Sequence, residues 1–190
     1  LMPFAVGGGI TTVQQARDIF SRGAEKVCIN TSMIERPEVI TQISETFGAQ
    51  AVVVSIDFKR NWRGRYETYI RCGSKSVGRY PVDLAQEMEA LGAGEILINA
   101  IERDGTQSGY DIDLIKQVSE AVTVPVIACG GAGSKEDLAE GLKSGQASAV
   151  AAGSLFVFHG RRRAVLINFP SKEDRQWIYH KAGAMYENSD

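Results

Sequence analysis

The feature that most constrains the fold of this chain is the sequence of residues 51–57, AVVVSID. A run of β-branched residues without polar alternation is typical of a strand buried on both faces, as parallel sheets require. The run ends on a carboxylate, Asp57. Burying a carboxylate is costly, and in parallel barrels the carboxyl ends of the strands carry the chemistry. We therefore interpret Asp57 as a functional acid; the alternative is that it only caps the following turn.

Strand and helix patterns alternate along the chain. We expect strands at residues 3–9, 26–30, 51–57, 95–100, 124–128 and 149–156, and helices within 12–23, 38–47, 82–91, 112–121 and 134–145. Capping-box pairs, Thr12 with Gln15 and Ser134 with Asp137, mark two helix starts. Residues 66–70 are expected in a small hairpin, and the tail, 171–190, either covers apolar surface or is disordered. This alternation predicts a parallel α/β architecture.

An internal repeat indicates that the sheet belongs to a barrel. At an offset of 122 residues, Pro3, Gly8, Gly9, Gly23 and Ser32 align without a gap with Pro125, Gly130, Gly131, Gly145 and Ser154. A repeat of this length is half of an eight-unit (βα)8, or TIM, barrel. By the same offset, the counterpart of Asp57 falls before Leu1. We therefore expect one domain, residues 1–190, that is a TIM barrel lacking about the first two strand–helix units and, with them, a second acid.

The repeat contains two glycine turns between a strand and a helix. These are Gly7, Gly8 and Gly9, and Gly130, Gly131 and Gly133. Unhindered backbone amides at a helix N-terminus favour a phosphate group. Neighbouring strand ends complete each turn, Asn30 and Thr31 at the first, and Ala152 and Gly153 at the second. Two such sites predict a substrate with two phosphates; the alternative is that the glycines only make tight turns.

Further polar residues follow the same strands. Asp104 and Gly105 lie after the strand at 95–100, where the Gly105 amide can reach the second phosphate, although Asp-Gly is also a common turn dipeptide. Residues 59–80 are rich in Lys and Arg, which favours attraction of an anionic substrate over nucleic-acid binding. Lys26 and Glu95 begin their strands at the opposite end of the barrel. They either face solvent or pair across the barrel axis.

Composition excludes several functional classes. The net charge of -2 and the pI of about 5.8 give no general attraction to nucleic acid or anionic lipid. No apolar run reaches the roughly 18 residues of a membrane span. Cys28, Cys72 and Cys129 show neither paired nor metal-type spacing, and His159 and His180 have no ligand partners nearby in sequence. We expect a cytoplasmic protein without a bound metal.

The order of several motifs resembles one known family. AVGGGI, KVCINTSMI, QAVVVSIDFKR, GAGEILINAIERDGTQSGYD and PVIACGGAG are similar to the cyclase subunit of imidazole glycerol phosphate synthase over about the first 160 residues. The resemblance implies a (βα)8 barrel without a cofactor, and a bisphosphorylated aminoimidazole carboxamide ribonucleotide as substrate. It also implies a glutaminase subunit that docks on the amino-terminal face of the barrel and supplies ammonia for the closure of the imidazole ring.

The same resemblance assigns roles to individual positions. Asp57 matches one of two catalytic aspartates. Lys26 and Glu95 match charges of the ammonia gate. The phosphate-binding positions are Gly9, Asn30 and Thr31 for one phosphate, and Asp104, Gly105, Gly131, Ala152 and Gly153 for the other.

Four positions near the substrate face depart from the family pattern. Glu102 stands in place of Asp, Asn99 of Thr, Cys129 of Ser and Gly153 of Ser. The segment AAGSLFVFHGRRRAVLINFP is more similar to a paralogous subunit that delivers ammonia for amidation of a nucleotide sugar in surface-polysaccharide synthesis. A third alternative is a non-catalytic phosphate-binding fragment, because only one of the two acids is present.

Overall fold

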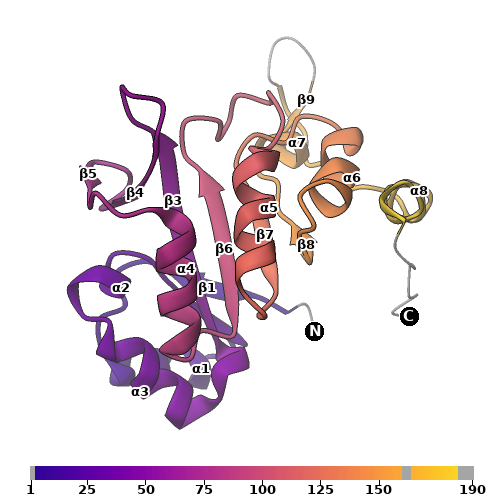
Figure 1. Ribbon diagram of the computed structural model, residues 1–190. Helices are drawn as coiled ribbons and strands as arrows, with labels where there is room; N and C mark the ends of the chain where they lie inside the picture. The colour runs from indigo at the N-terminus through magenta and orange to yellow at the C-terminus, as the bar shows by residue number, and fades with distance from the viewer. Residues whose placement is uncertain (1–2, 160–163, 184–190) are drawn as a thin grey trace.

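A parallel sheet forms the centre of the computed structural model, which describes residues 3–159 and 164–183 (Figure 1). The strand order is β1-β2-β3-β6-β7-β8, and all five pairings are parallel. The strands are β1 (Ala5–Gly7), β2 (Lys26–Ile29), β3 (Val52–Arg60), β6 (Glu95–Ala100), β7 (Val126–Cys129) and β8 (Ala149–Val150). Within the described ranges, β1 and β8 each pair on one side only. The sheet is therefore an open half-barrel of the TIM type, as expected.

Helices follow the strands in alternation. They are α1 (Val13–Ser21), α2 (Ser32–Glu35), α3 (Glu38–Phe47), a 3-10 turn (Ala49–Ala51), α4 (Pro81–Ala90), α5 (Ile112–Ala121), α6 (Lys135–Lys143), α7 (Ser154–Val157) and α8 (Lys172–Ala182). Both capping boxes are present: Thr12 accepts from the Gln15 amide at 3.3 Å, and Ser134 accepts from the Asp137 amide at 3.2 Å. The helices α1 and α6 thus begin at the capping residues that the sequence predicted.

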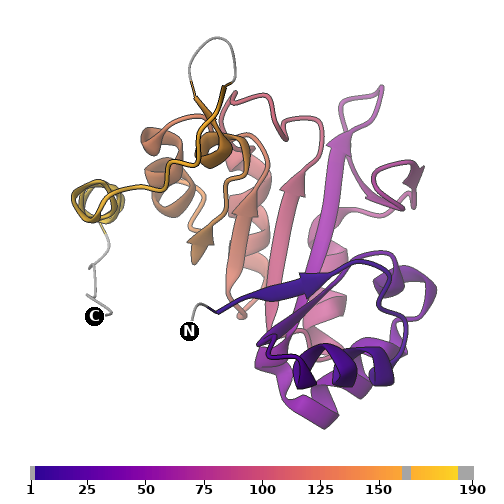
Figure 2. The same ribbon diagram turned by 180° about the vertical axis from the view of Figure 1, so that it is seen from behind.

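The two faces of the sheet differ in character. On β3, Val54, Ile56 and Phe58 are buried, whereas Ser55 and Asp57 between them are half-buried. The buried set packs with apolar residues of the helices, including Ile40, Leu84, Met88 and Leu114. The helices α3, α4 and α5 cover this face in Figure 1, and the view from behind looks onto β3, β6 and β7 (Figure 2). Alternation along each strand therefore places Asp57 on the inner face of the half-barrel.

The hairpin prediction is confirmed, but Asp57 does not end its strand. β3 continues to Arg60 and pairs antiparallel with β4 (Tyr66–Ile70), which pairs in turn with β5 (Lys75–Ser76). Asp57 lies opposite Tyr69 in this hairpin and beside Asn99 of β6. The strand extends because the antiparallel partner satisfies backbone groups beyond the parallel part of the sheet.

The end of the chain corrects two expectations. The strand expected at 149–156 ends at Val150, and Ser154–Val157 is the short helix α7, because a short apolar run does not distinguish a strand from one helical turn. A two-stranded ribbon, β9 (Phe158–His159) with β10 (Ala164–Val165), follows. In the tail, α8 buries Ile178 to 4% exposure and packs on α6, so this part covers apolar surface. Residues 184–190 lie outside the described ranges.

Candidate functional site

Asp57 sits in a polar layer that crosses the inner face of the sheet. Asn99, its neighbour in register on β6, donates a hydrogen bond from Nδ2 to Asp57 Oδ1 at 2.9 Å. Burial raises the pKa of the Asp57 carboxyl above its ordinary value; the amides of Asn99 and Asn30 offset part of this rise, and the negative charge of Asp104 adds to it. A carboxyl with a raised pKa changes protonation closer to neutral pH, which suits a group that both accepts and donates protons.

The first glycine turn and Asp57 share one cavity of about 510 Å³. Its lining includes Gly9, Asn30 and Thr31, so the structure brings these sequence-predicted residues together with the acid. Gly8 and Gly9 have φ angles of +111° and +70°, and a Cβ added at either would meet nothing within 4 Å. The backbone of this turn is therefore open to a ligand, and its left-handed conformation explains the glycines.

The rim of this cavity contains Arg71, which belongs to the basic segment 59–80. The Arg71 amide donates to the Thr31 hydroxyl at 3.1 Å, and the Arg71 guanidinium pairs with Glu35 at 2.7 Å. Arg71 and Cys72 have φ angles of +54° and +55°, a conformation that costs a non-glycine residue about 1 to 3 kcal/mol. Sequence reasoning placed Arg71 only in a basic segment, because no local pattern indicates a left-handed pair.

The second glycine turn is packed where the first is open. Gly130 and Gly131 are buried, and the Gly131 carbonyl accepts from the Gly109 amide at 2.8 Å. A Cβ at Gly131 would lie 2.2 Å from the Gly109 carbonyl oxygen, and one at Gly133 would lie 2.6 Å from the backbone oxygen of Gln107. Glycine is thus required here for the close approach of the loop at 101–110. At this second motif, the need for a tight turn and close packing therefore explains part of the glycine pattern without a phosphate.

Two of the remaining predicted phosphate-binding positions, Gly105 and Gly153, lie near the start of α7. A Cβ built on Gly105 would be 3.7 Å from Ser154 Oγ, which places the Asp104-Gly105 turn against the start of α7. Gly153, the residue before α7, would meet nothing within 4 Å and is exposed. Asp104 and Gly153 are exposed and Gly105 is half-buried, whereas Gly131 is buried.

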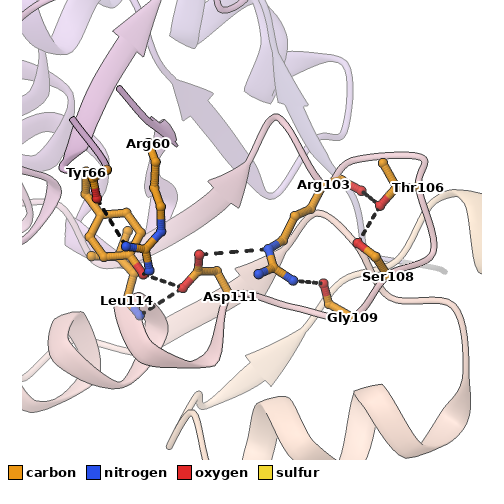
Figure 3. Close-up of polar contacts among 9 residues, drawn as sticks. Arg60, Tyr66, Arg103, Thr106, Ser108, Gly109, Asp111 and Leu114 are labelled. Carbon is orange, nitrogen blue, oxygen red and sulfur yellow. Dashed lines mark hydrogen bonds and ion pairs between the residues drawn. The ribbon is translucent and has the colours of Figure 1, made fainter. Parts of the chain in front are cut away.

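A buried carboxylate, Asp111, links the hairpin to this loop (Figure 3). Asp111 is 4% exposed; its Oδ1 accepts from the Tyr66 hydroxyl at 2.7 Å and from the Leu114 amide at 3.3 Å, which caps α5. Arg103 lies 3.8 Å from Asp111 Oδ2 and donates to the Gly109 carbonyl at 3.2 Å. Burial and the neighbouring Asp111 raise the pKa of Tyr66, so its hydroxyl remains a donor. The network fixes the loop that carries Asp104 and Gly105.

Lys26 and Glu95 form an ion pair at the opposite end of the strands, between Lys26 Nζ and Glu95 Oε1. Their strands, β2 and β6, flank β3, so the pair crosses one strand on the inner face. The side chains are 34% and 20% exposed. The two side chains therefore pair, as one of the two alternatives expected, but they do so across one strand of an open sheet and while partly exposed.

Two free thiols line the same face as Asp57. Burial is the main cause that raises the pKa of Cys28, and it raises the pKa of Cys129 to about 11. Both thiols are therefore protonated at neutral pH and are poor nucleophiles. Within the described residues, no group of three or more His, Cys, Asp and Glu side chains is arranged to hold a metal ion. None of the helices in residues 3–159 and 164–183 has the length and apolar character needed to cross a bilayer.

An open parallel half-barrel with its polar residues at the carboxyl ends of the strands defines the class, a TIM-barrel-type α/β protein. The sequence profile of the family described as "Histidine biosynthesis protein" matches residues 1–162, and the chain belongs to this family.

Among its curated relatives is the imidazole glycerol phosphate synthase subunit HisF of Alkaliphilus metalliredigens, 49% identical over 158 residues, which are 83% of this chain and 63% of that protein. A putative subunit hisF2 of Pseudomonas aeruginosa is 48% identical over 89% of this chain and 67% of its own length. A putative subunit HisF of Leptospira interrogans is 43% identical over 94% and 71%. The chain thus spans about two thirds of the length of these relatives.

Proposed function

We propose that this chain is a cyclase subunit of imidazole glycerol phosphate synthase, acting in histidine biosynthesis in the cytoplasm. The substrate is a bisphosphorylated aminoimidazole carboxamide ribonucleotide in its phosphoribulosyl-formimino form. Ammonia from a glutaminase subunit converts it to imidazole glycerol phosphate. The relatives that carry this name support the proposal at 43% to 49% identity.

One observation carries this proposal: Asp57 and the open first glycine turn line the same cavity. A phosphate at Gly9, Asn30 and Thr31 leaves the rest of the substrate to extend along the inner face, past Asp57. Imine formation and ring closure both require proton transfers, which a carboxyl with a raised pKa can perform. The exposed Asp104 and Gly153, together with the half-buried Gly105, are proposed to bind the second phosphate.

The glutaminase subunit is proposed to dock at the amino-terminal ends of the strands. The paired charges Lys26 and Glu95 lie at this end, on the inner face. In this position the pair can gate the passage of ammonia toward Asp57. Opening the gate requires only that one side chain rotate away from the other, because both are partly exposed.

The test is turnover of the bisphosphorylated substrate by a full-length version of the protein, with ammonium salts as the nitrogen source, which removes the need for the glutaminase. Formation of imidazole glycerol phosphate supports the proposal. Absence of turnover with phosphate binding intact would favour the alternative of a non-catalytic phosphate-binding protein.

A second candidate is the paralogous subunit that delivers ammonia for amidation of a nucleotide sugar. The observation that favours this candidate concerns Asn99. This residue departs from the family pattern, and it donates the hydrogen bond to Asp57. Cys129, another departure, lies beside Asn99 in register. In this alternative the chain does not turn over the imidazole precursor but binds its glutaminase. Turnover therefore separates it from the first proposal, and glutaminase binding separates it from a non-catalytic phosphate-binding protein.

A further inference from the structure

We infer that Arg71 is a further phosphate-binding residue of the first site, held by Glu35 in the free protein and transferred to the phosphate when substrate binds. This inference rests on the proposed function, which it deepens by adding a cationic ligand. It concerns the loop that follows β4, which belongs to the basic segment 59–80 and contributes Arg71 to the rim of the cavity.

A cation at the rim would favour the binding of a phosphate in this cavity. Of the described residues that line it, Arg71 is the one with a positive charge, whereas Glu35 and Asp57 carry negative charges when ionised. A phosphate monoester brings up to two further negative charges beside these carboxylates. Backbone amides supply only partial positive charge, so a full cation at the rim would lower the electrostatic cost of binding.

The backbone places Arg71 at the phosphate-binding residues. Its amide donates to the Thr31 hydroxyl at 3.1 Å, and that hydroxyl lies 3.4 Å from Asn30 Oδ1. Two consecutive residues, Arg71 and Cys72, adopt left-handed conformations to make this approach. Strain of this kind persists where the surrounding structure enforces it and is concentrated at ligand sites.

The ion pair between the Arg71 guanidinium and Glu35 is weak enough to be broken when a phosphate binds. Nε and Nη2 of Arg71 both contact the same oxygen, Glu35 Oε1, at 3.0 and 2.7 Å. The side chains are 59% and 40% exposed, and exposed ion pairs contribute little to stability. A phosphate offers the planar guanidinium two oxygens, with bidentate geometry that a single carboxylate oxygen does not provide. Phosphate can therefore compete with Glu35 for the guanidinium.

The test compares Arg71→Gln with Glu35→Gln in the 190-residue chain. Both substitutions break the same ion pair, and Arg71→Gln keeps the backbone hydrogen bond to Thr31. We expect Arg71→Gln to weaken the binding of inorganic phosphate and ribose 5-phosphate about ten- to a hundredfold, the effect of one charged hydrogen-bonding partner. We expect Glu35→Gln to strengthen binding a few-fold, because it removes a competitor and a negative charge. Binding is followed by NMR shifts of the Gly8 and Gly9 amides.

The matched control is Arg79→Gln, which breaks the exposed Arg79–Glu87 ion pair outside the lining of this cavity and should leave affinity unchanged. If Arg71→Gln binds as tightly as the unmodified chain, or if Glu35→Gln weakens binding as much as Arg71→Gln, the inference is wrong while the first phosphate site stands. If the unmodified chain shows no shift at Gly8 and Gly9, the inference and the proposed phosphate site fail together.

Discussion

At the scale of single residues, the structure distinguishes a carboxylate with a functional environment from one with a structural environment. Asp57 is half-buried, lies on the wall of a cavity, and has a raised pKa. Asp111 is more deeply buried, but it accepts hydrogen bonds from Tyr66 and Leu114 and is close to Arg103. Because the Asp111 carboxylate is occupied by these partners, it is suited to a structural role. The Asp57 carboxylate faces the cavity, so it is suited to proton transfer.

The first prediction concerns Asp57→Asn. This substitution keeps the shape of the side chain and its acceptor for Asn99, but it removes the proton-transfer group. We expect the rate of cyclisation to fall by at least about a hundredfold, while substrate affinity stays within about tenfold. The measurements are kcat with ammonium salts and the dissociation constant of the substrate. Unchanged turnover would remove Asp57 from the mechanism.

The same variant should be more stable at neutral pH. Because the folded-state pKa of Asp57 lies above its unfolded value, the folded state binds more protons between the two pKa values. Stability therefore falls as pH rises through this interval, and the penalty is fully present above the folded-state pKa of Asp57. Asp57→Asn removes it, so we expect a higher midpoint of thermal unfolding at pH 7 and no difference below about pH 4, the ordinary carboxyl pKa. A constant difference across this pH range would contradict the assignment.

A second residue-scale prediction concerns Asn99→Ala. The Asn99 amide stabilises the ionised form of Asp57, so its removal should raise the pKa of Asp57 further. If Asp57 acts as a base, the fall of kcat/KM toward acid pH then moves to higher pH. The direct measurement is the 13C NMR titration of the Asp57 carboxyl carbon. A pKa that is unchanged or lower would show that Asn99 does not tune the acid.

At the scale of elements, the site depends on a connection between the β3–β4 hairpin and the loop before α5. Tyr66 of β4 and Leu114 of α5 meet at Asp111, as Figure 3 shows. The same loop packs against the second glycine turn through Gly109 and Gly131. One set of contacts thus positions both the strand that carries Asp57 and the turn that carries Asp104 and Gly105.

The prediction at this scale is that Tyr66→Phe destabilises the fold. The substitution keeps the ring against Phe58 but removes a donor from a buried carboxylate, which should lower the free energy of unfolding by about 1 to 3 kcal/mol. The measurement is urea denaturation. Tyr69→Phe in the same strand is the control, because its ring contact with Lys59 survives loss of the hydroxyl. Equal changes in the free energy of unfolding for the two substitutions would show that the hydrogen bond to Asp111 does not stabilise the fold.

At the scale of the whole molecule, the sheet has two edges, β1 and β8, whose outer sides pair with no strand among the described residues. β1 and β8 each have one neighbour within the described residues, and Ala5 and Ala149 on these strands are exposed. Unprotected edges of parallel strands pair with other chains. The open half-barrel therefore has a tendency to associate that a closed ring of strands would lack.

The corresponding prediction is concentration-dependent self-association of the 190-residue chain, reduced by Ala5→Lys. A lysine on an edge strand opposes pairing with a strand of another chain, because its charged side chain repels other lysines and has to stay in contact with water. The measurement is light scattering between low and high micromolar concentrations. Ala90→Lys at the end of α4, also exposed, is the charge-matched control and should leave association unchanged. A chain that is monomeric throughout this range would contradict the prediction.

The sequence alone determined the alternation of strands and helices, both capping boxes, and the grouping of Asp57 with Gly9, Asn30 and Thr31, because periodicity and the geometry of parallel strands fix which residues share an edge and a face. Only the tertiary structure decided that the first glycine turn is open while the second is packed by Gly109, and that Ser154–Val157 is a helix. It alone placed Arg71 at Thr31 and Asp111 at Tyr66. These contacts join residues 40 and 45 positions apart, and a local pattern contains no information about such distant neighbours.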